Sequence, residues 1–344
     1  MKLFIYCNVN TVSDYAPFAE ILAKFGIEVT CVHGRLFLSQ SGPFKVVPDP
    51  TLIERLKRFN PDLVILDSLL YTPKMAKLTG RKVIYHMIAD VWSEYSPYKT
   101  PRSFFARLYY HYLSAILDQS IQDTNLVLAN SKWLLNIVKE KIPKHPANLF
   151  YTGIDANEWV PHQKTPSYLK YPAVVGIFDF TIYQKVSGLL KFTEVIRKMP
   201  DVNFYFAGNG PYFNLVKQSC PPNMFLIGRV SKPDVAKLLG NADIFVHPSG
   251  LDVLPRSVKE ASLMEKPIIA SNVGGIPEII KNNQTGYLCE IDDVDQWIAK
   301  IRFLLDNPDV ARMFGKNARK FVMETFDWKK ISQGFIETLQ AFRE

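Results

Sequence analysis

The stretch Phe245–Ile280, FVHPSGLDVLPRSVKEASLMEKPIIASNVGGIPEII, indicates the fold of the whole chain. Its pattern predicts a buried strand that ends at Val246 and a break at residues 248–250. A helix follows, with Pro255 in its first turn, where a missing N–H costs nothing. A second short strand at 268–270 and a Gly-Gly turn complete the unit, which is typical of a parallel α/β sheet.

Two acids stand on either side of the expected helix start. Asp252 lies in the loop before the helix, and Glu260 lies inside the helix, eight positions later. Free N–H groups and the helix dipole attract phosphate at such a place, and a nearby carboxylate can bind the vicinal hydroxyls of a ribose. From the spacing alone, an ordinary loop residue at Asp252 and a solvated helix acid at Glu260 are an equally good interpretation of the pair.

The same stretch resembles a known family in the order and spacing of its residues. The chain has Glu260-Ala261, then KPIIAS at 266–271 and VGGIPE at 273–278. This run is similar to the C-terminal signature of retaining glycosyltransferases of family 4, the glycosyl transferases group 1. It departs from the family at Asp252, where the family usually has a Glu. The Asp252 side chain is one methylene shorter than that Glu.

The resemblance implies a GT-B fold, an α/β architecture of two Rossmann-like domains that face each other across a deep cleft. The expected domains are an acceptor-binding domain over 1–161 and a nucleotide-sugar-binding domain over 162–327. A C-terminal helix over 328–344 would cross back to the first domain. GIDANEWVP at 153–161 and FDW at 326–328 resemble the family's connections between these parts.

The composition fits a packed protein of two ordinary domains. The chain has 344 residues, of which 47% are hydrophobic and 22% are charged. Its net charge of +8 suits nucleic acid, an anionic membrane surface or phosphorylated substrates. The four cysteines form no C-x-x-C pair, which favours buried thiols over disulfides or zinc.

The start of the sequence contains only a short apolar run, and no stretch approaches the length of a membrane span. We therefore expect a cytoplasmic protein, with peripheral contact to the membrane face as an open alternative.

In the first half, alternating strands and helices predict a doubly wound parallel sheet, which binds ligands beyond the carboxyl ends of its strands. His86 ends the expected strand at 82–86. A lone histidine is most often a hydrogen-bonded structural residue, whereas the resemblance implies that His86 faces the donor sugar and is catalytic.

The loop after the first strand lacks the glycines that the family often has there. Asn10 and Thr11 can still bind a hydroxyl, so we place them on the acceptor side. The segment 92–113 interleaves aromatic and basic residues, including Trp92 and Tyr95. It is either an ordinary packed helix, a surface that contacts an anionic membrane, or a stacking surface for the acceptor.

The second half contains the expected donor site. The family commonly has an Arg after the Gly of its first strand, but here Ile177 follows Gly176. Lys185 is then the best candidate for the diphosphate, with Arg229 or Arg256 as a second cation. His247 is interpreted as structural. By resemblance the donor-binding set is Gly176, Lys185, Gly228, Arg229, Leu254, Arg256 and Glu260.

The resulting hypothesis is a retaining hexosyltransferase that moves a hexose from a UDP- or GDP-sugar to a glycan, lipid-linked or small-molecule acceptor. Glu260 would bind the ribose and Asp252 a sugar hydroxyl, and His86, Asp252 and Glu260 form the expected catalytic set. The resemblance implies no metal, no cofactor and no nucleic acid.

Three alternatives stay open. A dinucleotide-dependent oxidoreductase would need a G-x-G-x-x-G after the first strand, which the sequence lacks. A non-catalytic protein that binds sugar nucleotides or lipid fits the departures at Asp252 and Ile177. A sugar-nucleotide epimerase of the same fold would act without an acceptor.

Overall fold

The structure of the protein is a computed structural model that describes residues 1–8, 12–34, 51–67, 74, 77, 79–94, 112, 115–161 and 169–343. The chain divides into two compact units, one formed by Met1–Gly153 with Trp328–Glu344 and the other by Ile154–Asp327. The boundary expected from the sequence lies at 161 instead. Ile154 already joins the second unit, because its N–H donates to the Phe326 carbonyl at 2.9 Å and it bridges Asp327.

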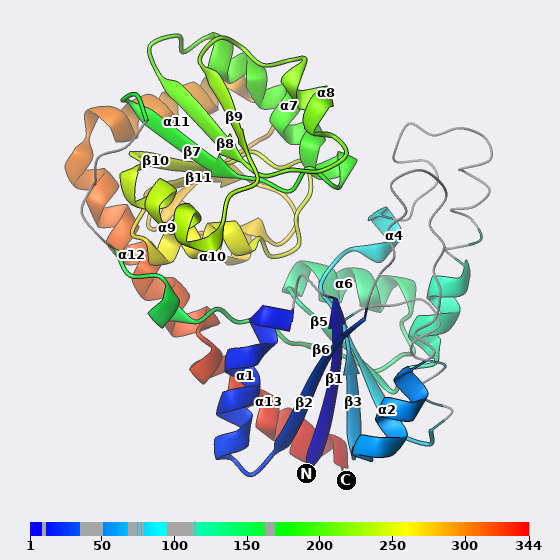
Figure 1. Ribbon diagram of the computed structural model, residues 1–344. Helices are drawn as coiled ribbons and strands as arrows, with labels where there is room; N and C mark the ends of the chain where they lie inside the picture. Colours follow the sequence, from blue (N-terminus) through cyan, green and yellow to red (C-terminus); the bar gives the residue numbers. More distant parts are fainter. Residues whose placement is uncertain are drawn as a thin grey trace. The chain divides into compact units, whose positions relative to one another are not determined.

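The first unit is built on a six-stranded parallel sheet in the order β2-β1-β3-β4-β5-β6 (Figure 1). Its strands are β1 (Lys2–Asn8), β2 (Glu28–Gly34), β3 (Leu63–Leu66), β4 (Lys82–Met87), β5 (Leu126–Ala129) and β6 (Ala147–Leu149). Its described helices are α1 (Val12–Lys24), α2 (Leu52–Phe59), α4 (Val91–Glu94), α6 (Lys132–Lys141) and α13 (Trp328–Arg343).

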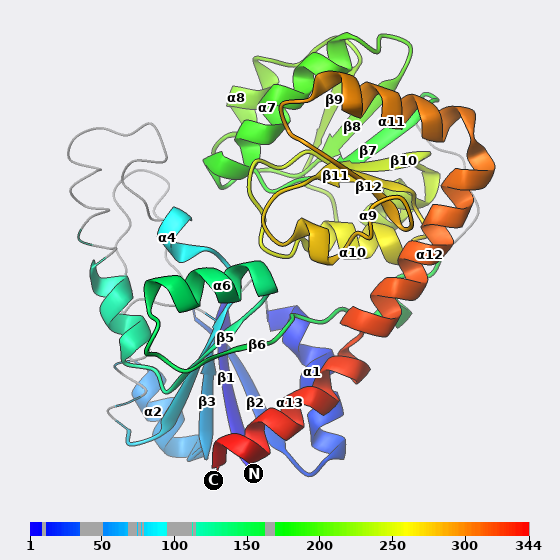
Figure 2. The same ribbon diagram turned by 180° about the vertical axis from the view of Figure 1, so that it is seen from behind.

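Helices cover both faces of this sheet. On one face α1 and the returning α13 pack together, with the Phe18 and Trp328 rings stacked at 4.8 Å (Figures 1 and 2). On the other face α2 buries Leu52 and Leu56 against β1, β3 and β4. A Cβ on Gly153 would lie only 2.3 Å from the Trp328 ring, which is too close for any side chain. The glycine therefore allows Trp328, the first residue of α13, to pack against the backbone at 153.

The second unit has its own six-stranded parallel sheet, in the order β12-β11-β10-β7-β8-β9. The strands are β7 (Ala173–Ile177), β8 (Asn203–Ala207), β9 (Met224–Gly228), β10 (Ile244–His247), β11 (Ile268–Ser271) and β12 (Gly286–Cys289). The helices are α7 (Tyr183–Arg197), α8 (Phe213–Lys217), α9 (Lys232–Asn241), α10 (Arg256–Leu263), α11 (Val294–Asp306), α12 (Pro308–Phe326) and the 3₁₀ turns η1 (Ala156–Glu158) and η2 (Ile276–Glu278).

Strand order reverses between β7 and β10. From β7 the chain adds β8 and β9 on one side, then returns to add β10, β11 and β12 on the other. The carboxyl ends of β7 and β10 are therefore the place at which doubly wound sheets bind ligands. The α/β fold class predicted from the sequence is confirmed in both units.

Local sequence signals placed most elements well. The apolar pattern predicts a helix at 52–59 and a strand at 203–207, and α2 and β8 confirm both. Ser131 is predicted to cap a helix, and its side chain caps α6 by accepting the Leu134 N–H at 3.0 Å. Two local predictions are wrong. The apolar pattern predicts a strand at 149–151, but the strand formed there, β6, lies two residues earlier. Pro255 is the extended N-cap of α10, with ψ at 122°, and does not lie within its first turn.

Candidate active site

The candidate site lies at the carboxyl edge of the second sheet, where β7 and β10 are neighbours. The loop after β10 turns sharply at Gly250, and the first turns of α7 pack directly on it. The Gly250 N–H donates to the Lys185 carbonyl at 3.2 Å. A Cβ on Gly188 would lie 2.3 Å from the Gly250 nitrogen, so only glycine permits this approach. The contact brings α7 and its Lys185 up to the loop.

The Gly-Gly turn of the opening motif holds the same loop from another direction. The Gly275 N–H donates to the Asp252 carbonyl at 3.0 Å. Gly274 has a positive φ of 57°, and a Cβ there would stand 2.0 Å from the Asp252 carbonyl oxygen. The Asp252 backbone is thus fixed between α7 and the turn after β11. The Gly-Gly pair therefore supports the position of the acid.

The carboxylate of Asp252 is the centre of a buried charged cluster. Its Oδ1 lies 3.3 Å from Lys185 Nζ and accepts the Val253 N–H at 3.0 Å. Its Oδ2 lies 3.1 Å from His247 Nε2. Burial raises the pKa of this carboxyl, but the Lys185 charge and the His247 hydrogen bond outweigh it and lower the pKa to about 2. Asp252 is therefore ionised throughout the physiological range.

His247 is the residue of this cluster that the sequence analysis did not select. Because an ionised carboxylate only accepts, His247 Nε2 donates to Asp252. The other nitrogen, Nδ1, is buried and has no hydrogen-bond partner in the part of the chain that the structure describes. The ring packs against Phe178 at 5.6 Å. Its position at the end of β10, beside the reversal of strand order, was the available signal.

Glu260 and Arg256 form a second pair, one turn apart on α10. Arg256 Nε donates to Glu260 Oε1 at 2.8 Å. The glutamate side chain is 11% exposed and the arginine side chain 37% exposed, so the carboxylate is nearly buried and the guanidinium is partly open to solvent. Leu254 is buried just before the helix. Arg256 and Glu260, which are both predicted to bind the donor, therefore also bind each other.

The remaining predicted donor residues have different surroundings. Gly176 lies inside β7, where a Cβ would stand 2.6 Å from the Phe206 ring, so packing alone explains this glycine. Gly228 ends β9 with φ at 81°, and its carbonyl accepts the Gly208 N–H at 2.8 Å. Arg229 follows and is exposed. The structure gives no ion pair to Arg229 among the described residues.

His86 is fully buried in the core of the first unit. Its Nδ1 lies 2.7 Å from the Tyr15 hydroxyl, and its Nε2 lies 3.1 Å from the Phe150 carbonyl. A carbonyl only accepts, so Nε2 donates and Nδ1 accepts from Tyr15. Both ring nitrogens are thus occupied by the protein. This geometry matches the structural interpretation of His86 and leaves no ring nitrogen for a substrate.

The predicted acceptor side is described only in part. Trp92 is half-buried in α4, and its indole N–H donates to Asp118 Oδ1 at 2.8 Å. Asn10, Thr11 and Tyr95 lie outside the described residues, as does most of the segment 92–113. Over the described ranges, no cluster of three or more metal-type ligands occurs. Nor does any helix in those ranges have the length and apolarity needed to cross a membrane.

The second unit, which contains the candidate site, is similar to a known protein family, and most of the chain is similar to curated proteins. Residues 158–321 match the family described as Glycosyl transferases group 1. A sulfoquinovosyl transferase of Arabidopsis thaliana is 26% identical over 303 residues, which are 84% of this chain and 58% of that protein. The N-acetyl-alpha-D-glucosaminyl L-malate synthase of Bacillus anthracis is 27% identical over 231 residues, 64% of this chain and 60% of that protein. The chain thus spans about three fifths of these relatives.

Solved structures share the fold at low sequence identity. A sucrose-phosphate synthase from Thermosynechococcus elongatus superposes with a TM-score of 0.74 at 16% identity, covering 99% of both chains. An Anabaena protein, HepE, in complex with UDP-glucose superposes with a TM-score of 0.73 at 17% identity, covering 99% of this chain and 100% of that chain. These likenesses establish the arrangement of strands and helices.

Proposed function

We propose that this chain, whose residues 158–321 match the glycosyl transferases group 1 and whose two units have the α/β GT-B fold, is a member of that family and transfers a hexose from a nucleoside-diphosphate sugar to an acceptor hydroxyl. The observation that supports the proposal is the Lys185–Asp252–His247 cluster. A cation and a permanently ionised carboxylate stand together at the carboxyl edge, where strand order reverses. Glycosyl transfer from a nucleotide sugar needs both kinds of group.

Lys185 is the group proposed to bind the donor diphosphate. As the glycosidic bond breaks, negative charge builds on the leaving nucleoside diphosphate, and a fixed cation stabilises it in the transition state. The Lys185 side chain is only 22% exposed and is held by Asp252 at 3.3 Å. Its ammonium is thus oriented before the donor arrives, which reduces the reorganisation needed during the reaction.

Asp252 is proposed to bind a hydroxyl of the donor sugar. A carboxylate offers about four lone-pair directions. Lys185 and the Val253 N–H use those of Oδ1, and His247 uses one of Oδ2. The remaining direction on Oδ2 can accept a hydroxyl. The aspartate is shorter than the glutamate usual in the family, and His247 fixes it at its place in the loop.

Glu260 is proposed to bind the ribose, with Arg256 as a second cation for the diphosphate. Their mutual hydrogen bond at 2.8 Å orients both side chains near the start of α10. For the donor we favour a UDP-sugar, because HepE was solved with UDP-glucose. A relative from Escherichia coli, 29% identical over 133 residues, is also named as a UDP-Gal-dependent galactosyltransferase. The proposed transfer retains the anomeric configuration of the sugar and needs no metal. Its acceptor is a glycan, a lipid-linked molecule or a small molecule.

The test is a panel of labelled nucleotide sugars, UDP- and GDP-linked, incubated with the protein and a cell lipid and glycan extract. We expect label to appear in an acceptor and one nucleoside diphosphate to be released for each transfer. Glu260→Ala should lose most activity, while Glu324→Ala, which removes an exposed acid of α12, should not. Donor binding without turnover would instead indicate a binding protein. Isomerised donor in the absence of acceptor would indicate an epimerase.

A further inference from the structure

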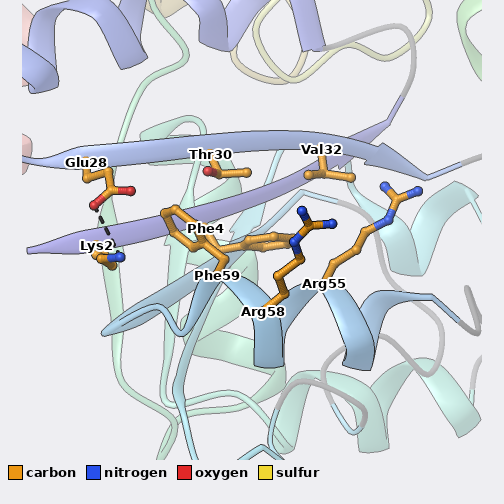
Figure 3. Close-up of a pocket in the computed structure, with 8 residues that line it drawn as sticks. All are labelled: Lys2, Phe4, Glu28, Thr30, Val32, Arg55, Arg58 and Phe59. Carbon is orange, nitrogen blue, oxygen red and sulfur yellow. Dashed lines mark ion pairs between the residues drawn. The ribbon is translucent and has the colours of Figure 1, made fainter.

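The first unit contains a pocket that the proposed reaction does not use (Figure 3). Its floor is one face of β1 and β2, where Lys2 pairs with Glu28 and Phe4 pairs with Thr30 in the parallel register. Its opposite wall is α2. The volume is about 410 Å³, and the lining residues are Lys2, Phe4, Glu28, Thr30, Val32, Arg55, Arg58 and Phe59.

This pocket is separate from the carboxyl edge of its own sheet. Lys2 and Glu28 are the first residues of β1 and β2, so the pocket begins at the amino ends of these strands. Doubly wound sheets bind their principal ligand at the other end. The charged groups of the pocket therefore need an explanation of their own.

The pocket has an excess of positive charge. Lys2 Nζ lies 3.4 Å from Glu28 Oε2, which neutralises one cation. Arg55 and Arg58 are exposed, and within the described residues neither guanidinium has a hydrogen-bond or ion-pair partner. They stand three positions apart on α2, so they lie on the same face and repel one another. An anion between them would relieve this repulsion.

An apolar surface lies directly beside the two guanidinium groups. The Phe4 and Phe59 rings are 6.1 Å apart with their planes tilted by 50°. Phe4 is buried, whereas Phe59 and Val32 are half-buried and border the open space. Figure 3 shows the Arg58 guanidinium beside the two phenylalanine rings and the Arg55 guanidinium toward Val32. The ligand that fits has an anionic group and an apolar body.

We propose that this pocket binds a phosphate monoester with an apolar organic group. Two guanidinium groups suit a phosphate better than a carboxylate, because a phosphate dianion has enough oxygens to accept from both. The phosphate binds between Arg55 and Arg58, and the organic group lies on Phe59 and Val32. Soluble esters and phosphatidic acid headgroups share this chemistry, so the experiment has an arm for each source.

The soluble arm is calorimetry of the full chain with phenyl phosphate at low salt. We expect saturable binding that is weaker for inorganic phosphate, which lacks the ring, and absent for phenol, which lacks the charge. The double variant Arg55→Gln/Arg58→Gln should weaken binding at least tenfold. Lys57→Gln is the matched control, because Lys57 is an exposed cation of the same helix that does not line the pocket.

The lipid arm is co-sedimentation with phosphatidylcholine vesicles, with and without phosphatidic acid. If the source is a lipid, binding requires phosphatidic acid, is lost in Arg55→Gln/Arg58→Gln, survives in Lys57→Gln and is displaced by phenyl phosphate. Unchanged circular dichroism and thermal unfolding of the variants show that each one is folded. The proposal is overturned if neither probe binds in a manner that depends on Arg55 and Arg58. It is equally overturned if Lys57→Gln weakens binding as much as the double variant.

Discussion

Two histidines at the carboxyl ends of parallel strands, His86 in β4 and His247 in β10, show how similar positions acquire different roles. His86 has both ring nitrogens bonded within the core of the first unit, to Tyr15 and to the Phe150 carbonyl. His247 bonds the ionised Asp252 through one nitrogen, and its other nitrogen has no partner among the described residues. The position at a strand end is common to both. They differ in their hydrogen bonds, because the fold provides partners for both ring nitrogens of His86 but, among the described residues, for only one of His247.

The largest effect should come from the cation of the His247 cluster. Lys185→Gln removes the charge that stabilises the leaving diphosphate, so we expect kcat/KM to fall by about 10²–10³-fold. Steady-state release of nucleoside diphosphate measures it. Lys191→Gln is the control, since Lys191 is an exposed cation farther along α7 that pairs with Asp292. Equal losses in the two variants would contradict a specific role for Lys185.

The second effect concerns the pH dependence of stability. The pKa of Asp252 is lowered to about 2 in the folded protein, below the value of about 3.9 in an unfolded chain. A depressed carboxyl pKa contributes stability above the unfolded value, here between about 2 and 3 kcal/mol, and that stability is lost as the pH falls from about 4 to 2.

Urea unfolding of the wild type and Asp252→Asn at a series of pH values measures this contribution. The difference in free energy of unfolding should be constant above about pH 5 and should shrink below pH 4. A difference that does not change with pH would show that Asp252 is not the titrating group.

The third effect tests the hydrogen bond of His247 itself. His247→Leu removes the donor to Asp252, so the carboxylate loses one of the groups that orient it, and we expect kcat/KM to fall about tenfold. His247→Gln keeps an N–H group near the position of Nε2 and should restore most of the loss. Identical activities of the Leu and Gln variants would show that this bond does not position Asp252.

The smallest effect is expected at the other histidine. Tyr15→Phe leaves His86 Nδ1 buried without its donor, which should cost about 1 kcal/mol of unfolding free energy. Turnover should stay within about twofold of the wild type, because His86 is placed in the core. Thermal unfolding and turnover are measured on the same sample. A large loss of turnover at unchanged stability would return His86 to the active site.

Most of the fold could be predicted from the sequence because its signals are local. Alternating apolar runs, the Ser131 cap and glycines after helices fix the elements to within a residue or two. The order of strands in a sheet depends on contacts between distant segments, which no local pattern contains. The boundary at Gly153 is likewise set by a contact, since Trp328 packs on that glycine.

The candidate site could be predicted one residue at a time. Lys185, Asp252 and Glu260 were identified from their motifs, but their partners were not. The ion pair of Lys185 with Asp252 depends on Gly188 and Gly250, which bring α7 against the loop after β10. His247 was passed over because a histidine after an apolar run is usually structural. The bond to Asp252 becomes visible only when the loop is folded.

The return of α13 to the first unit has a consequence for biosynthesis. The core of that unit needs Trp328, Phe335 and Leu339, which are buried beside Phe18 and are translated after the whole of the second unit. The second unit, by contrast, is one uninterrupted segment from Ile154 to Asp327. The usual vectorial order of domain folding is therefore reversed. On the ribosome the second unit can fold first, while the first unit waits for its last helix.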